Sequence, residues 1–126
     1  MDKLTFISEI KPLLKAMGYR KNGNYWYKAV NDLTFCVNVQ GLQWDKNDYY
    51  VNIGIAITNP SIKNPTQLHW YCTHRCRGID GEQTNIPPAE IIRIVNDTFP
   101  ADMTSAQMTS FLNKHKAQWV IGQFWF

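Results

Sequence analysis

Residues 33–40 read LTFCVNVQ, and their side chains alternate along the chain between two kinds. The apolar row consists of Leu33, Phe35, Val37 and Val39. The polar or small row consists of Thr34, Cys36, Asn38 and Gln40. Because successive side chains of a β-strand point to opposite faces, this alternation predicts a strand with one face on the core and the other face polar.

Further strands are predicted on both sides of this one. They are residues 25–30 (YWYKAV), 49–58 (YYVNIGIAIT) and 68–76 (LHWYCTHRC). The link Asn31-Asp32 has the length of a tight hairpin turn, and the basic run before residue 25 reads as a turn. Strands joined by short links pair antiparallel, so we expect a meander sheet of about four to five strands. The aromatic tail, residues 117–126, predicts a last strand or an extended segment.

Helical patterns precede and follow the strands. Residues 2–17 carry apolar side chains at steps of three and four, with Asp2 as N-cap and Gly18 just past the end. Pro12 should kink this helix or restart it near residue 11. Two more helices are predicted, one from Pro87-Pro88 to before residue 100 and one from about residue 104. The order predicts an α+β fold with the helices packed on one face of the sheet.

Composition excludes several classes of protein. The chain has 126 residues, 44% of them hydrophobic and 18% charged, with a formal net charge of +3. This composition predicts a single domain over residues 1–126 and excludes a disordered chain. No apolar run reaches the ~18 residues of a membrane span, and the first residues do not read as a secretory signal. Three cysteines, an odd number, favour a reducing compartment, so we expect a cytoplasmic protein.

The polar rows of the predicted strands share the sheet face that the helices leave uncovered, and an antiparallel sheet can leave that face in water. Amides, hydroxyls, rings and one guanidinium on such a face suit a polar or anionic ligand. The alternative is a solvated face with no ligand. The residues that we predict to make contacts are Asn38, Gln40, Asn52, Tyr71 and Arg75.

Catalytic and metal-binding patterns are weak. His69, Cys72, His74 and Cys76 have zinc-ligand chemistry, and alternation puts the last three on one side of a strand. Residues two apart on a strand are separated by about 7 Å, which is too far for three ligands of one ion, so we expect no metal and no cofactor. Cys36 with His69 is the one nucleophile–base pair that the pattern allows. The sequence therefore favours a protein that is not an enzyme.

Basic residues gather near the first turn, at Lys15, Arg20, Lys21 and Lys28, beside three aromatic residues at 25–27. Charge interleaved with rings can bind single-stranded nucleic acid. The pI of about 8.8 stays below that of typical nucleic-acid-binding domains, so we expect no nucleic-acid partner. The rings at Trp119 and residues 124–126 suit either the core or a partner contact, including self-association.

Four short runs resemble the bacterial DUF4304 family of domains of unknown function. They are residues 13–21 (LLKAMGYRK), 24–27 (NYWY), 37–40 (VNVQ) and 50–55 (YVNIGI). The resemblance covers roughly residues 3–78. Members of the family also tend to have a histidine- or cysteine-bearing strand that ends in an Arg-x-Gly step, and the arginine of that step corresponds here to Arg75 or Arg77. It implies no activity. Some small bacterial families of this kind act as immunity proteins beside toxins, which implies a protein partner.

These observations lead to one hypothesis and two alternatives. We expect a non-catalytic binding domain that engages a protein partner, like an immunity protein, through the open polar sheet face. The alternatives are a small enzyme or ligand-binding protein that uses the same sheet concavity, and a binder of single-stranded nucleic acid. A net charge of +3 is unexpected for a neutraliser of a basic nuclease, because such a partner is normally acidic.

Overall fold

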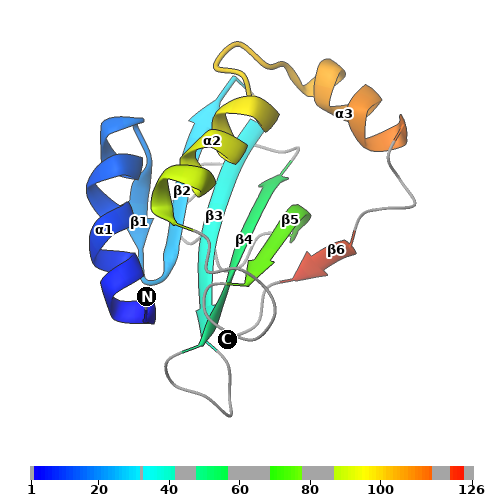
Figure 1. Cartoon of the computed structure of the whole chain (residues 1–126). Helices are drawn as coiled ribbons and strands as arrows, with labels where there is room; N and C mark the ends of the chain where they lie inside the picture. The colour runs from blue at the N-terminus through cyan, green and yellow to red at the C-terminus, as the bar shows by residue number, and fades with distance from the viewer. Residues whose placement is uncertain are drawn as a thin grey trace.

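The structure is a computed structural model that describes residues 2–31, 33–41, 48–56, 69–77, 87–114 and 120–123. The helices and strands within these ranges are α1 (Lys3–Ala16), β1 (Arg20–Asn22), β2 (Tyr25–Val30), β3 (Leu33–Gly41), β4 (Tyr49–Ala56), β5 (His69–Arg77), α2 (Pro88–Thr98), α3 (Ser105–Lys114) and β6 (Val120–Gln123). All strand pairs are antiparallel, and the strands follow one another across the sheet in chain order (Figure 1). The predicted α+β fold with a meander sheet is confirmed.

The first strand is a departure from the sequence prediction. Residues 20–22, expected to form a turn, pair with residues 25–27 as the short strand β1. The physical reason is Gly23, whose φ of 60° closes a tight β1–β2 hairpin that few other residues could adopt. The next hairpin is as predicted: Val30 pairs with Leu33 across two residues, and Asn31 takes a positive φ of 54°.

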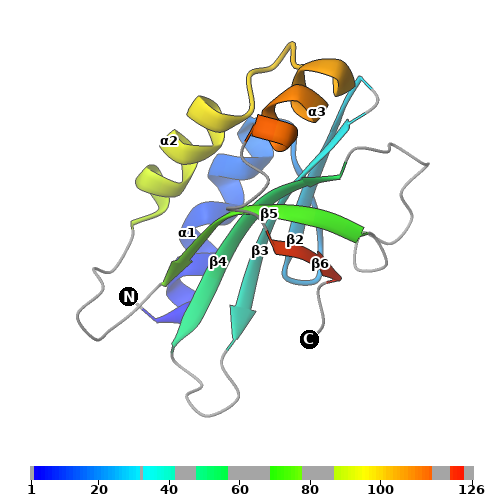
Figure 2. The same cartoon turned by 90° about the vertical axis from the view of Figure 1, so that its right-hand side faces the viewer.

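The main core lies between the sheet and the helices. Figure 2 shows α1 and α2 on the same side of the sheet. The predicted apolar row of β3 is buried there with the apolar row of β4. Phe6 and Leu14 of α1 and Ile91 of α2 are fully buried against them. The predicted assignment of the two faces of β3 and β4 is therefore confirmed.

Helix α1 begins and ends as its sequence indicates. The Asp2 carboxylate accepts a hydrogen bond from the Thr5 backbone N–H at 2.7 Å, which lowers the pKa of Asp2. Gly18, with a φ of 90°, follows the C-cap. Of the two outcomes expected at Pro12, a kink or a restart, the restart near residue 11 is wrong, because α1 continues through Pro12. Burial of one face of the helix outweighs the single backbone bond that proline removes.

Strand β5 contains an irregularity that the sequence does not reveal. Ile53 pairs with His74 and Gly54 pairs with Cys72, so Thr73 is an extra residue in the ladder. Such a bulge exchanges the two faces of the strand. The prediction that Cys72, His74 and Cys76 share a side is therefore wrong. Cys76 packs against the main core, whereas Cys72 packs on the opposite face.

Two further predictions concern the C-terminal tail and a membrane span. The tail forms β6, which pairs with β5, and Trp119 and residues 124–126 lie outside the described residues. In the described part of the chain, no helix is long and apolar enough to cross a bilayer.

Candidate binding site on the sheet face away from the helices

Cross-strand pairing gathers most of the predicted contact residues into two adjacent rows. One row runs from Tyr25 through Asn38 and Asn52 to Arg75, and the next places Gln40 opposite Tyr50. Directly paired residues of neighbouring strands share a face. Four of the five predicted site residues therefore lie together. Arg75, not Arg77, stands beside Asn52.

Hydrogen bonds connect the side-chain amides of β3 and β4. The Asn52 Nδ2 donates to Asn38 Oδ1 and to Gln40 Oε1, both at 3.0 Å. The Asn38 Nδ2 in turn donates to the Asn24 carbonyl at 3.3 Å. Asparagine and glutamine suit this arrangement because each amide both donates and accepts. The result is a fixed chain of amides across β3 and β4, which we call the amide ladder and define as Asn38, Asn52 and Gln40.

The amide ladder is buried at its centre. Asn38 and Asn52 are both 0% exposed, and Gln40 is half-buried. Next to them, Tyr25, Cys36 and Ala56 form a second small buried cluster. The face that alternation predicted to be open to water is therefore closed over Asn38 and Asn52. Neither side chain is placed to contact a partner directly.

The exposed end of the ladder is a guanidinium stacked on a ring. The carbon at the centre of the Arg75 guanidinium lies 4.1 Å from the centroid of the Tyr50 ring. Its Nη2 donates to Gln40 Oε1 at 3.3 Å, the same oxygen that Asn52 holds. Arg75 is exposed and Tyr50 is half-buried. A cation held over an aromatic face and by one hydrogen bond is already oriented before any ligand arrives.

One polar atom in the ladder has no partner in the described part of the chain. The Asn52 Oδ1 is buried and accepts no hydrogen bond there. Buried side-chain oxygens are normally satisfied, and an unsatisfied one carries a desolvation cost. Asn52 is therefore held in place by what it donates.

Tyr71 is the one predicted site residue that the strand register separates from the others. It lies on the other side of the bulge and pairs with Ile55, a residue of the main core. The structure describes Tyr71 by its backbone pairing alone. Tyr50, which alternation placed on the polar face without singling it out, occupies the place beside Arg75 instead. The signal for it was an aromatic residue two positions before Asn52 on the same face.

Burial changes the acid–base properties of the thiols and of one histidine. It raises the pKa of the Cys36 thiol to about 12, and it also raises the pKa of Cys72. It lowers the pKa of His74. A thiol must lose its proton to act as a nucleophile or metal ligand, so burial opposes both uses of Cys36. Within the described ranges, no three acidic, histidine or cysteine side chains are grouped as metal ligands are.

Comparisons with known proteins agree with the resemblance seen in the sequence. The sequence profile of the domain of unknown function DUF4304 matches residues 10–120. No curated protein and no solved structure matches the chain significantly. Since the profile spans most of the 126 residues, the chain belongs to the DUF4304 family.

Proposed function

We propose that the chain is a binding domain rather than an enzyme, and that it engages a protein partner through Arg75 and the Tyr50 ring beneath it. The observation that carries this proposal is the exposed guanidinium held by both Tyr50 and Gln40. Arginine and tyrosine are enriched among the residues that dominate binding energy at interfaces. A side chain fixed in advance loses less conformational entropy when a partner binds.

The amide ladder supports this role by holding Arg75 in place through hydrogen bonds. The Asn52 amide fixes the Gln40 oxygen that receives Arg75, and Asn38 fixes Asn52 in turn. Asn38 and Asn52 would act as positioning residues, because both are fully buried. This assignment keeps four of the predicted residues in one site: Arg75 contacts the partner, Gln40 holds Arg75, and the buried Asn38 and Asn52 hold Gln40 in place.

The chemistry of Arg75 indicates the kind of partner. A guanidinium presents a fork of donors that matches a carboxylate. The net charge of +3 also favours association with an acidic surface. We therefore infer a protein with exposed acidic residues. An immunity-like role fits if the neutralised toxin has an acidic surface, and it fits a basic nuclease poorly.

The test begins with capture of partners by the tagged full chain from its source cells. Each captured protein is then purified, and its Kd is measured against the wild type, Arg75→Ala and Arg93→Ala. Arg93 is the matched control, since it is also exposed but lies on α2. Arg75→Ala should weaken binding about thirtyfold, the effect of ~2 kcal/mol, and Arg93→Ala should leave it unchanged.

Self-association is measured in parallel by light scattering. A dimer that Arg75→Ala converts to monomer would support the same surface with a second copy as the partner. Equal affinity of wild type and Arg75→Ala for every captured protein, in a chain whose oligomeric state does not change, would contradict the proposal.

A further inference from the structure

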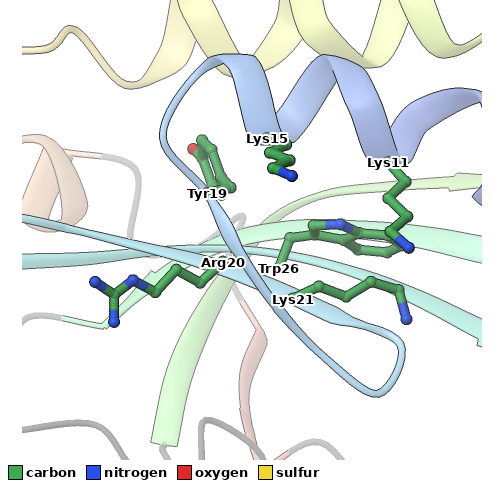
Figure 3. A pocket seen from close by; sticks show the side chains of 6 residues that line it. All are labelled: Lys11, Lys15, Tyr19, Arg20, Lys21 and Trp26. Carbon is green, nitrogen blue, oxygen red and sulfur yellow. The ribbon is translucent and has the colours of Figure 1, made fainter.

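A basic pocket lies on the opposite side of the sheet, between α1 and the β1–β2 hairpin. It has a volume of about 330 Å³. Its lining residues are Lys11, Lys15, Tyr19, Arg20, Lys21 and Trp26 (Figure 3). Small-molecule sites typically measure about 300–1,000 Å³, so this pocket has room for a small ligand.

Trp26 lines the pocket and carries a buried polar atom. Its side chain is 1% exposed, and its Nε1 finds no acceptor among the residues that the structure describes. The indole nitrogen can only donate, and buried tryptophan normally has a hydrogen-bond partner. Figure 3 shows this nitrogen on the side of the ring that faces α1. The lining of the pocket thus includes a residue whose buried donor has no acceptor in the described part of the chain.

Three lysines surround the same ring. Lys11 and Lys15 lie one turn apart on α1 and extend toward the indole, and Lys21 extends along its other side (Figure 3). The Lys21 Nζ lies 5.5 Å from the centroid of the Trp26 ring. No acidic side chain in the described ranges forms an ion pair with any of the three. Like charges at this helical spacing repel, and a bound anion would offset that repulsion.

We propose that this pocket binds a phosphate group, with the Trp26 indole N–H donating to a phosphate oxygen and Lys11 and Lys15 supplying the opposite charge. Lysine is a usual phosphate ligand because it acts as a point charge. A phosphate ester carries about −1.5 to −2 charges at neutral pH, against −1 for a carboxylate, which matches a group of lysines better. The Arg20 guanidinium points away from the lysines, so the positive charge beside the indole comes from ammonium groups (Figure 3).

The pocket is independent of the proposed protein-binding site. Trp26 pairs with Val37, a main-core residue, and therefore belongs to the helix side of the sheet. Arg75 and the amide ladder belong to the other side. Either proposal can fail while the other holds.

The direct readout is the Trp26 indole N–H signal in a ¹H–¹⁵N spectrum of the full chain. The signal is assigned as the one missing from Trp26→Phe. Inorganic phosphate is added at constant ionic strength, with chloride as the replaced ion. We expect the signal to shift and to saturate, and we expect Lys11→Gln/Lys15→Gln to weaken the phosphate Kd at least tenfold.

The control pair Lys3→Gln/Arg93→Gln removes the same charge away from the pocket and should leave the phosphate Kd unchanged. A mononucleotide and a single-stranded oligonucleotide are titrated next. Binding of both indicates a small phosphate ester. Binding of the oligonucleotide alone, with a steep salt dependence, indicates a nucleic-acid backbone.

Three results would overturn the proposal: no shift with any phosphate compound, an equal shift with acetate, or wild-type phosphate affinity in the Lys11→Gln/Lys15→Gln variant. If Trp26→Phe does not fold, calorimetry measures the Kd of inorganic phosphate for Lys11→Gln/Lys15→Gln and for Lys3→Gln/Arg93→Gln. Equal values for the two variants would overturn the proposal in the same way.

Discussion

At the scale of single residues, Asn52 shows how a polar group becomes structural. Its two amide hydrogens join neighbouring strands through Asn38 and Gln40, and no part of it reaches solvent. Asn52 is thus a poor probe of binding, since its loss acts on stability first. Arg75, which is exposed, is the better probe.

Replacing Asn52 with alanine should lower the free energy of unfolding by about 1–3 kcal/mol, because the buried Asn38 oxygen loses its donor. Gln40→Ala should cost less, since Gln40 is only half-buried and its second partner is exposed. Urea denaturation of both variants measures the difference. An Asn52→Ala variant as stable as the wild type would show that the ladder adds nothing to the fold.

For single residues, the sequence predicted correctly which face of the sheet each side chain occupies, but it did not predict which side chains are buried. Alternation assigned Asn38, Gln40 and Asn52 to one face correctly, because side-chain direction depends only on position in a strand. Their exposure depends on which side chains of neighbouring strands meet them. That is set by the pairing register, which a single strand does not encode.

At the scale of elements, the β5 bulge shows the same limit. The nine residues of this strand alternate acceptably without a bulge, so nothing in their pattern indicates that Thr73 is extra. One inserted residue exchanges the faces of everything beyond it. It separated Tyr71 from the predicted site and Cys72 from Cys76.

The β2–β3 hairpin is tied to the segment between α2 and α3 by one side chain. Asn31 adopts a φ of 54°, and its Nδ2 donates to the Met103 carbonyl at 2.8 Å. Asn31→Gly keeps the favourable backbone and loses this bond, which should cost about 0.5–1.5 kcal/mol. Asn31→Ala should cost about 1 kcal/mol more, because alanine is strained at positive φ. Chemical denaturation orders the two variants, and equal stabilities would contradict the backbone argument.

Helix α1 offers a stabilising change. Pro12 is exposed and cannot donate to the carbonyl of Ser8, four residues earlier. Pro12→Ala restores that donor and should raise the free energy of unfolding by about 1–3 kcal/mol, after the loss of proline's restraint on the unfolded chain. Thermal denaturation tests this, with exposed Leu13→Ala as control. An unchanged or lower Tm for Pro12→Ala would mean that the proline fits this helix without strain.

At the scale of the whole molecule, the sheet buries weak acids on both of its faces. Cys36 lies in the small cluster on one face, and Tyr19 and Tyr49 lie in the main core on the other. Burial raises the pKa of Cys36 and of Tyr49 to about 12, and it also raises the pKa of Tyr19. The folded chain therefore holds these protons at a pH where the unfolded chain releases them.

This arrangement predicts alkaline unfolding with a definite sign. Because the folded pKa values exceed the unfolded ones, the stabilisation is complete below about pH 8, the lower limit for unfolded cysteine, and declines as pH rises toward 12. Thiols titrate before phenols in the unfolded chain, so Cys36→Ala should flatten the first part of the decline, near pH 9–10, more than the later part. Urea midpoints at pH 7, 9 and 10.5 for both proteins measure this. A midpoint that stays constant to pH 10.5 would show that these groups titrate alike in the folded and unfolded chains.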